Sequence, residues 1–485
     1  MLDLPTLRPY QDDLLDAIIE QYQRGYRRVL ARADTGAGKT VVFSAITLRA
    51  TLKRKRVTIA AHRVEIVDQI SRALDSFGVR HGRIQSGHTM TDDPVQVAMI
   101  ITLGKRLDQI AAPDLFVIDE CHHATGGSYR VIADRWIKTR ILGVTATPNR
   151  LDGRGLDDCF DVMVEAIPMA DLIAQGFLAG YTYLAPPTRI DLSSVATRNG
   201  DYAVDQLAAA TDKSVITGDA VGHAKMYLAG RPAIVFTVTV EHAEHVAAQF
   251  AEAGFRAASV DGSMSSKERR SRIEGIGNGN LDILTSCQLI SEGTDIPAVG
   301  GAILLRPTKS LALHLQQVGR SLRPKSDGSN AVILDHVGNI RHGLPDAPRI
   351  WSLAAKKKKK HEDAPVAQCE VCYRVFGVYP NWKQKLRDHN EPCQEPTDPR
   401  CLLMSEGSSG GERELPEAEE GTLSVVSTSP EWAGGLNIAT ARGTEWYRLM
   451  DRADTLEKLA QVAKARGYHW KWARNVMAAR ARKAA

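Results

Sequence analysis

Long apolar runs are absent from this sequence of 485 residues. No stretch approaches the roughly 18–20 consecutive apolar residues that a membrane-spanning helix requires. The first residues, "MLDLPTLRPYQDDLL", carry early acidic side chains and lack the apolar core of a secretory signal. The sequence is therefore expected to be that of an intracellular, cytoplasmic protein.

A strong charge bias and internal repeats are missing as well. The net charge of +5 allows nucleic-acid binding but does not argue for it, because local clustering matters more than the sum. No self-similarity occurs at the periods of solenoid proteins. Cysteine is sparse, with seven residues, four of which fall between residues 369 and 401. In a reducing compartment such a cluster favours a metal site over disulfides.

The length and composition, with 43% apolar and 25% charged residues, are those of a multidomain globular protein. Short β-branched runs alternate with helical stretches, first in "RVTIAAH", "VQVAMIIT", "LFVIDE" and "RILGVTAT". A second series follows in "AIVFTVTV", "LDILTSC", "GAILLRP" and "AVILDHV". Continuous apolar runs of this length are typical of buried parallel strands covered by helices. The fold class predicted is therefore two tandem RecA-like parallel-sheet domains.

Changes in composition along the chain predict its boundaries. Residues 1–168 and 169–352 form the two α/β units, with linking helices and an extra strand near "YTYLAPP" opening the second. Three shorter parts follow: a basic connector with the cysteine cluster (353–400), an acidic linker expected to be disordered (401–430) and a helical tail (431–485).

The stretch "ARADTGAGKT" (residues 31–40) predicts a phosphate-binding loop between a strand and a helix. It differs from G-x-x-x-x-G-K-[ST] only in Ala33 at the first position. Gly36 and Gly38 let backbone N–H groups face phosphate oxygens, Lys39 would reach the β- and γ-phosphates, and the Thr40 hydroxyl would ligate Mg²⁺.

Two acidic residues, Asp119 and Glu120, end the apolar run "LFVID". At the C-terminal end of a parallel strand, Asp119 would hold Mg²⁺ and Glu120 would orient or deprotonate the attacking water. A solvated strand end is the alternative interpretation of these two residues alone.

A series of motifs in order decides between these interpretations. "LRPYQ", "DTGAGKT", "AHRVEIVDQ", "DECH" and "TATP" lie in the first half, and "IVFTVTV", "TSCQLISEGTDIP" and "QQVGRSLRP" in the second. In these motifs the chain resembles the superfamily 2 helicases of the DEAD/DEAH-box type, with a DECH variant, over about residues 7–340. The resemblance implies ATP hydrolysis with Mg²⁺ in a cleft between the two domains.

The resemblance also assigns nucleotide-binding roles. Gln11 would read the adenine edge, although "RPYQDDLL" would equally well start a helix. Gln316, Arg320 and Arg323 would point across the cleft at the γ-phosphate, a task that suits the fixed charge and forked donors of arginine. The remaining residues implied to bind the nucleotide are Thr35, Gly36, Gly38, Lys39, Thr40 and Asp295.

Other motifs resemble the strand-contacting segments of the family. His62, Arg63 and Thr102 of the first half and Thr285 and Ser286 of the second would lie near backbone phosphates. Contacts of this kind carry little sequence preference. Each of these residues could instead be a helix cap or a turn residue.

The cysteine cluster, "CEVCYRVFGVYPNWKQKLRDHNEPC", predicts a second kind of site. A C-x₂-C pair, followed by a helix with ligands four residues apart, is the spacing of a ββα zinc finger. The predicted structural Zn²⁺ ligands are Cys369, Cys372, His389 and Cys393. Cys401 is a rival fourth ligand, and unmetallated thiols are the plain alternative.

The end of the chain mixes aromatic and basic residues, as in "RGYHWKWA". Such a mixture suits stacking on bases, or equally the core of a small helical hairpin. A helicase core followed by a cysteine cluster and this tail resembles the RadD-like DNA-repair helicases of bacteria and phages.

Together these patterns predict an ATP-dependent helicase or translocase that acts on DNA, single-stranded or branched, in repair or recombination. The tail would offer a site for a protein partner. An RNA helicase, an ATP-switched binding protein that does not unwind, and the motor subunit of a restriction system are the rivals. No nuclease motif accompanies the core, which weakens the last of them.

Overall fold

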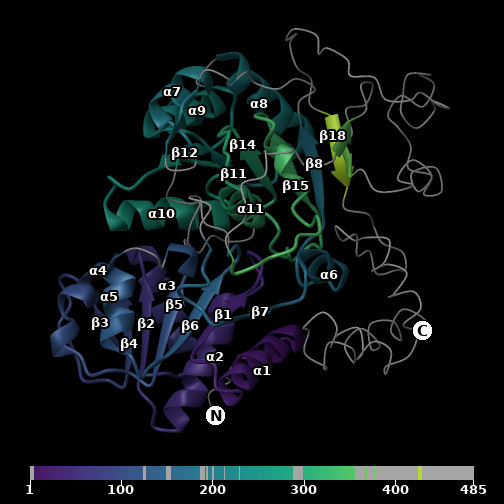
Figure 1. Ribbon diagram of the computed structural model, residues 1–485. Helices are drawn as coiled ribbons and strands as arrows, with labels where there is room; N and C mark the ends of the chain where they lie inside the picture. Colours follow the sequence, from purple (N-terminus) through teal and green to yellow (C-terminus); the bar gives the residue numbers. More distant parts are fainter. Residues whose placement is uncertain are drawn as a thin grey trace, which may run out of the picture.

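The computed structural model describes residues 5–123, 127–148, 155–185, 192, 195–198, 201–211, 214–228, 230–287 and 299–354, together with three short strands further on. Figure 1 shows two lobes that face each other, the first in purple and blue and the second in teal and green.

The first lobe is built on a seven-stranded sheet in which every pairing is parallel. Its order is β3-β4-β2-β5-β6-β1-β7. The strands are β1 (Arg28–Arg32), β2 (Val57–Ala61), β3 (Gly82–Ile84), β4 (Val95–Met99), β5 (Leu115–Asp119), β6 (Arg140–Thr145) and β7 (Val162–Glu165).

Helices cover both faces of this sheet, which explains why its strands are mostly apolar. Val29 and Ala31 of β1 belong to one buried cluster, with α1 (Pro9–Gln23), α2 (Lys39–Leu52) and α3 (Val64–Ser76). Leu30 faces the other way, into a cluster with α4 (Ile100–Lys105) and α5 (Gly127–Arg135). Alternate side chains of one strand thus enter two cores.

The second lobe is a seven-stranded sheet of order β12-β13-β11-β14-β15-β8-β18. Its strands are β8 (Tyr181–Ala185), β11 (Ala233–Phe236), β12 (Ala257–Val260), β13 (Ile283–Ser286), β14 (Gly301–Leu304), β15 (Ala331–Asp335) and β18 (Ser424–Thr428). Only β18 runs antiparallel, along the outer edge of β8. The helices of this lobe are α7 (Val204–Thr211), α8 (Ser214–Tyr227), α9 (Val240–Glu252), α10 (Ser266–Gly277) and α11 (Leu311–Gly319).

The two sheets share one strand order. Taking β8, β11, β12, β13, β14 and β15 as the counterparts of β1 to β6, both sheets read 3-4-2-5-6-1 from edge to edge. The seventh strand lies beside the first in each case, as β7 and as β18. The chain therefore holds two units of the same topology in tandem.

The predicted pair of parallel-sheet α/β units is confirmed, including the strand expected near "YTYLAPP". The run "VQVAMIIT" is shorter as a strand than predicted, because α4 begins at Ile100. Residues 424–428 form β18 inside the segment expected to be a disordered linker, and their sequence "SVVST" suits an edge strand. A hairpin of β16 (Val366–Gln368) and β17 (Val375–Gly377) precedes it.

Several contacts join the lobes. Arg269 of α10 forms an ion pair with Glu65 of α3, at 3.1 Å. The chain enters the second lobe through α6 (Met169–Ala174) and returns after β15, where the Leu353 carbonyl accepts a hydrogen bond from the Leu156 N–H at 2.7 Å. Within the described residues, no helix is long and apolar enough to cross a membrane.

Candidate nucleotide-binding cleft

The loop between β1 and α2 has the backbone of an anion site. Gly36 and Gly38 have φ angles of +86° and +79°, in the left-handed region that favours glycine. Gly38 precedes α2, and no side chain caps this helix. Helix-starting N–H groups without a cap are available to an anion, which the helix dipole also favours.

The start of α1 holds this loop from outside. The Tyr10 hydroxyl and the Gln11 amide nitrogen donate to the carbonyl of Ala37, at 2.9 and 3.2 Å. A Cβ on Gly38 would lie 2.4 Å from that amide nitrogen, so only glycine fits there. Gln11 thus lies against the loop, and its predicted contact with adenine stays a prediction.

Lys39 and the two acidic residues lie on the inner side of the loop. The Lys39 ammonium donates to the Ala33 carbonyl at 3.3 Å. Burial at the end of β5 and the neighbouring Glu120 carboxylate together raise the pKa of Asp119 to about 7, against the opposing charge of Lys39. The structure therefore brings the cation and the carboxylate of the predicted Mg²⁺ site together.

Glu120 is held by a polar network that the sequence did not reveal. Its Oε2 lies 3.2 Å from His122 Nδ1, which lies 3.0 Å from the Thr145 hydroxyl. Thr145 in turn accepts from the N–H of Thr147 at 3.1 Å. Glu120 itself has a φ of +48°, a strained conformation for a residue with a side chain. The "DECH" and "TATP" segments therefore form one hydrogen-bonded unit.

Helix α11 of the second lobe meets the loop directly. A Cβ on Gly319 would lie 2.6 Å from the Cβ of Thr35, so the helix and the loop are in contact. Gln316 and Arg320 are buried, and Arg323 follows the helix and is half-buried. Within the described residues, Thr35 Oγ1 and Gln316 Nε2 are buried without a hydrogen-bond partner. Asp295 lies outside the described residues.

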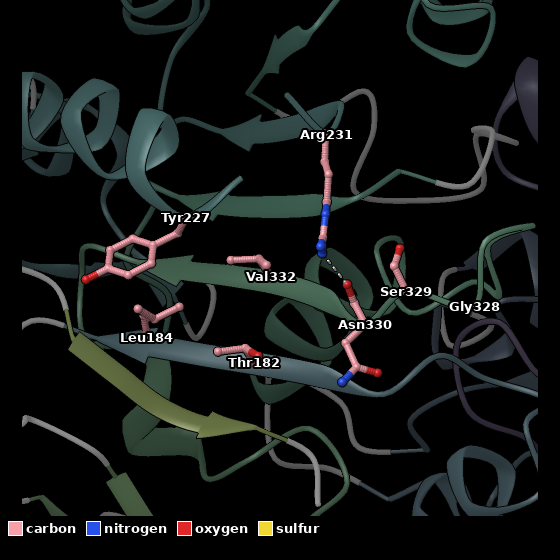
Figure 2. Close-up of a pocket in the computed structure, with 8 residues that line it drawn as sticks. All are labelled: Thr182, Leu184, Tyr227, Arg231, Gly328, Ser329, Asn330 and Val332. Atoms are coloured by element: carbon pink, nitrogen blue, oxygen red, sulfur yellow. Dashed lines mark hydrogen bonds between the residues drawn. The ribbon is translucent and has the colours of Figure 1, made fainter. Parts of the chain in front are cut away.

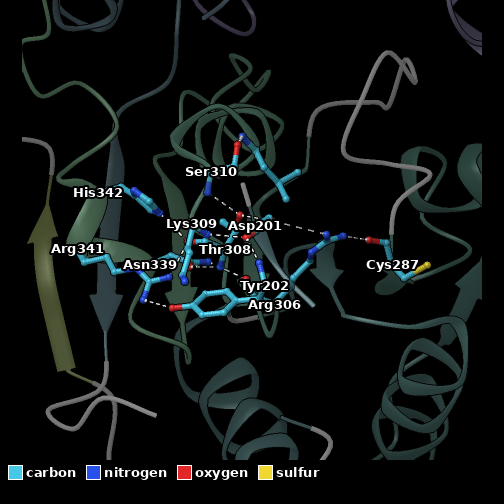
Figure 3. Close-up of polar contacts among 11 residues, drawn as sticks. Asp201, Tyr202, Cys287, Arg306, Thr308, Lys309, Ser310, Asn339, Arg341 and His342 are labelled. Atoms are coloured by element: carbon cyan, nitrogen blue, oxygen red, sulfur yellow. Dashed lines mark hydrogen bonds and ion pairs between the residues drawn. The ribbon is translucent and has the colours of Figure 1, made fainter. Parts of the chain in front are cut away.

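A dense polar cluster fixes the segment that leads into α11 (Figure 3). The Asp201 carboxylate, from the two-residue strand β10 (Asp201–Tyr202), accepts from the Thr308 hydroxyl at 2.8 Å and from the Lys309 N–H at 2.7 Å. Ser310 then caps α11 by accepting from the Leu313 N–H. The position of α11 therefore depends on residues over 100 positions earlier in the sequence.

The residues predicted to contact a nucleic-acid strand differ in burial. His62 and Arg63 lie in the turn between β2 and α3, and Thr102 lies on α4, all three half-buried. Thr285 is fully buried, and its hydroxyl donates to the Ala243 carbonyl of α9 at 2.6 Å. Ser286 is buried too, at the end of β13. In this arrangement Thr285 joins a strand to a helix and does not face solvent.

A separate cavity of about 460 Å³ lies on the second lobe, away from the cleft (Figure 2). It runs along β8 and the start of β15, whereas the loop and the acidic pair follow the C-terminal ends of β1 and β5. Its lining residues are Thr182, Leu184, Tyr227, Arg231, Gly328, Ser329, Asn330 and Val332.

The four predicted zinc ligands, Cys369, Cys372, His389 and Cys393, lie outside the described residues, as does their rival Cys401. The same holds for the predicted helical tail. Both stay predictions.

Comparison with known proteins extends this geometry. Residues 4–150 match the model of the family described as type III restriction enzyme, res subunit. Residues 221–325 match the helicase conserved C-terminal domain. The solved structure of a fragment described as an HsdR subunit of a type I restriction enzyme from Vibrio vulnificus has a similar fold, with a TM-score of 0.55 and 22% identity over 70% of this chain and 65% of that one.

Curated relatives are also found. A 51.5 kDa protein of a Lactococcus phage is 35% identical over 72% of this chain and 75% of its own length. A Saccharomyces cerevisiae protein with the name ATP-dependent helicase IRC3 is 29% identical over 72% of this chain. The match covers 54% of IRC3, so this chain spans about half the length of that protein. With both helicase domains matched in order and the phosphate loop in contact with α11, the chain belongs to the superfamily 2 helicases, a family of ATP-dependent enzymes.

Proposed function

We propose that this helicase is a DNA-stimulated ATPase that moves along a single strand, with one ATP site assembled from both lobes. The observation that carries the proposal is the contact of Gly319 in α11 with Thr35 in the phosphate loop. Closure of the lobes then completes the site, and reopening dismantles it.

The residues of the cleft fit Mg²⁺ and ATP. Uncapped N–H groups at the start of α2 and the Lys39 ammonium suit phosphate oxygens, and Thr40 with Asp119 offers oxygen ligands to Mg²⁺. The buried polar atoms of Thr35 and Gln316 face no partner within the described residues, as expected where a polar ligand belongs. When bound, Mg²⁺ neutralises charge on the transferred phosphoryl group.

Glu120 is the proposed base. Its carboxylate is fixed by His122 and Thr145, so one oxygen keeps a constant direction toward the water that attacks the γ-phosphate. The Thr145–Thr147 segment shares this network, so movement of that segment would reorient Glu120.

Arg320 and Arg323 are the proposed arginine fingers, with Gln316 and Asp295 beside them. An arginine supplied from a facing domain makes hydrolysis depend on closure and contributes about 10³–10⁵ in rate. Buried Arg320 lies one residue after Gly319, at the end of α11 that contacts the loop.

DNA is the proposed substrate, because the first lobe matches a restriction-enzyme family, a class that acts on DNA. His62, Arg63, Thr102 and Ser286, with Thr285 after rearrangement, would contact the sugar–phosphate backbone of single-stranded or branched DNA. A role in repair or recombination, a structural Zn²⁺ at the cysteine cluster and a protein partner for the tail complete the proposal.

The test is steady-state ATP hydrolysis with single-stranded, duplex and forked DNA, with RNA, and without nucleic acid. We expect single-stranded DNA to raise turnover at least about tenfold above the rate with RNA, and Lys39→Ala to abolish it. Stronger stimulation by RNA would favour the RNA helicase. Equal rates with and without every nucleic acid would leave an ATP-driven switch.

A further inference from the structure

The segment that follows β15 returns to the first lobe. We call residues 344–354 the return segment. The Arg349 guanidinium is buried and donates to the carbonyls of Leu344 at 2.8 Å, Pro345 at 2.8 Å and Ala347 at 2.9 Å. A fourth bond runs to the His342 carbonyl at 3.2 Å, and these four bonds hold a segment without regular structure in place.

The return segment places an aromatic ring on the first lobe. Trp351 is only 7% exposed, and the guanidinium carbon of Arg32 lies 5.0 Å from its ring centroid. Two residues later Leu353 bonds to the Leu156 N–H and packs against the core on the α5 side. Cation–π contacts of this geometry contribute about 0.5–2 kcal/mol.

Arg32 in turn touches two functional segments of the first lobe. Its Nη2 forms a buried ion pair with Asp34 of the phosphate loop. Its Nε donates to the carbonyl of Ala146, within the "TATP" segment, at 3.2 Å. One planar guanidinium therefore joins the phosphate loop, the segment that shares the Glu120 network, and a ring from the second lobe.

We propose that Trp351 is a positioning residue that acts through Arg32. It couples the placement of the second lobe to the phosphate loop and to the "TATP" segment, which contains Ala146. The ring holds the guanidinium in the plane in which it reaches both partners. When the lobes shift, the ring shifts with the return segment, and Arg32 loses that alignment. The proposal rests on the ATPase function proposed above.

Arginine suits this role because it stays charged when buried and offers donors in a fixed plane. Asp34 makes the exact placement of Arg32 important, because its Oδ2 is buried and has no hydrogen-bond partner within the described residues. Removal of the ring would let Arg32 tilt or admit water, and the buried carboxylate beside the phosphate loop would move with it.

Two measurements on the full chain test the proposal. The first is the ratio of ATP turnover with single-stranded DNA to turnover without it, together with KM for ATP. The second is hydrogen–deuterium exchange of peptides that cover residues 31–40 and 143–148, without nucleotide. The variants are Trp351→Ala and Trp351→Phe. The matched control is Trp136→Ala, which removes a tryptophan of similar burial that packs edge-on against Phe116 in the first lobe.

We expect Trp351→Ala to lower the stimulation ratio at least about fivefold while KM changes less than about twofold, and to raise exchange at both peptides. Trp351→Phe keeps an aromatic face and restores most of the ratio. Trp136→Ala lowers the melting temperature and leaves the ratio as in the wild type.

Two outcomes overturn the proposal: unchanged exchange at both peptides in Trp351→Ala, or an equal loss of stimulation in Trp136→Ala, which would indicate general destabilisation. A wild-type protein that DNA does not stimulate would refute the proposed function instead. Exchange at the two peptides would then decide alone whether Trp351 positions the loop.

Discussion

At the scale of single residues, the backbone geometry of the cleft could be predicted from the sequence where a motif requires a particular backbone shape. Gly36 and Gly38 adopt the left-handed conformation that the phosphate loop requires, and Lys39 begins α2 as predicted. Thr285 shows the limit of such reasoning. A hydroxyl in a motif can serve a strand–helix contact as well as a ligand, and only burial distinguishes the two.

Arg32 and His122 illustrate what could not be predicted. Arg32 ends a strand whose middle residues are apolar, and its partner Trp351 lies more than 300 positions later in the sequence. Nothing local in the sequence links two such residues, because their contact depends on how the whole second lobe is placed. His122 was visible in "DECH", but its bond to Thr145 required the neighbouring strand order.

Asp171 allows a prediction at this scale. It is buried in α6, and burial alone raises its pKa to about 7. Between about pH 4 and pH 7 the folded chain binds a proton there that the unfolded chain has lost, so the free energy of unfolding falls as the pH rises through this window. Asp171→Asn should match the wild type near pH 4 and be more stable by roughly 1–4 kcal/mol at pH 8.

Thermal unfolding of both proteins at pH 5 and pH 8 measures this difference. Asp108→Asn, at a highly exposed carboxylate, is the control and should show no pH-dependent gain. A gain for Asp171→Asn that is equal at both pH values would contradict the titration argument.

At the scale of elements, strands buried on both faces were predicted well, since a continuous apolar run has few other uses. Short or edge elements were not predicted from the sequence. They include β3 with three residues, β7 at the sheet edge and the ribbon of β9 (Thr197–Arg198) with β10. These form because a neighbour offers unpaired backbone groups, which a local pattern does not reveal.

The cap of α11 carries a prediction about function. Ser310 and Ser265 each accept a hydrogen bond from the N–H three residues on, at the starts of α11 and α10. Replacement of either by alanine should cost about 1 kcal/mol of stability. Only Ser310→Ala should also lower ATP turnover, by about three- to tenfold, because α11, which carries the proposed catalytic residues Gln316 and Arg320, contacts the phosphate loop through Gly319.

Melting temperatures and kcat of the two variants, measured side by side, check this expectation. Similar shifts in melting temperature with a loss of kcat confined to Ser310→Ala would support it. An equal loss of kcat in Ser265→Ala would mean that turnover does not depend on the position of α11 more than on that of α10.

At the scale of the whole molecule, an ion pair that joins the two lobes should affect their closure. Glu65 and Arg269 are about one fifth exposed or less, and their ion pair joins α3 to α10. We expect Glu65→Ala and Arg269→Ala each to lower DNA-stimulated turnover about two- to fivefold, and the double variant to be no worse than either.

A double-mutant cycle on kcat measures this coupling. The pair Arg256–Asp282, which lies within the second lobe, serves as the control cycle and should leave turnover unchanged. Fully additive losses for Glu65 and Arg269 would show that the ion pair does not contribute to closure as a unit.

The shared strand order of the two sheets has a consequence for stoichiometry. The chain is a head-to-tail pair of like units, yet the first strand of the second unit is followed by "PPTRID", which lacks the glycines and the lysine of the loop after β1. In the proposed function, one unit supplies the phosphate loop and its copy supplies the opposing arginines. We therefore expect each chain to bind one nucleotide and to close and reopen once per ATP. The distance travelled along a strand should then be proportional to the number of ATP molecules hydrolysed.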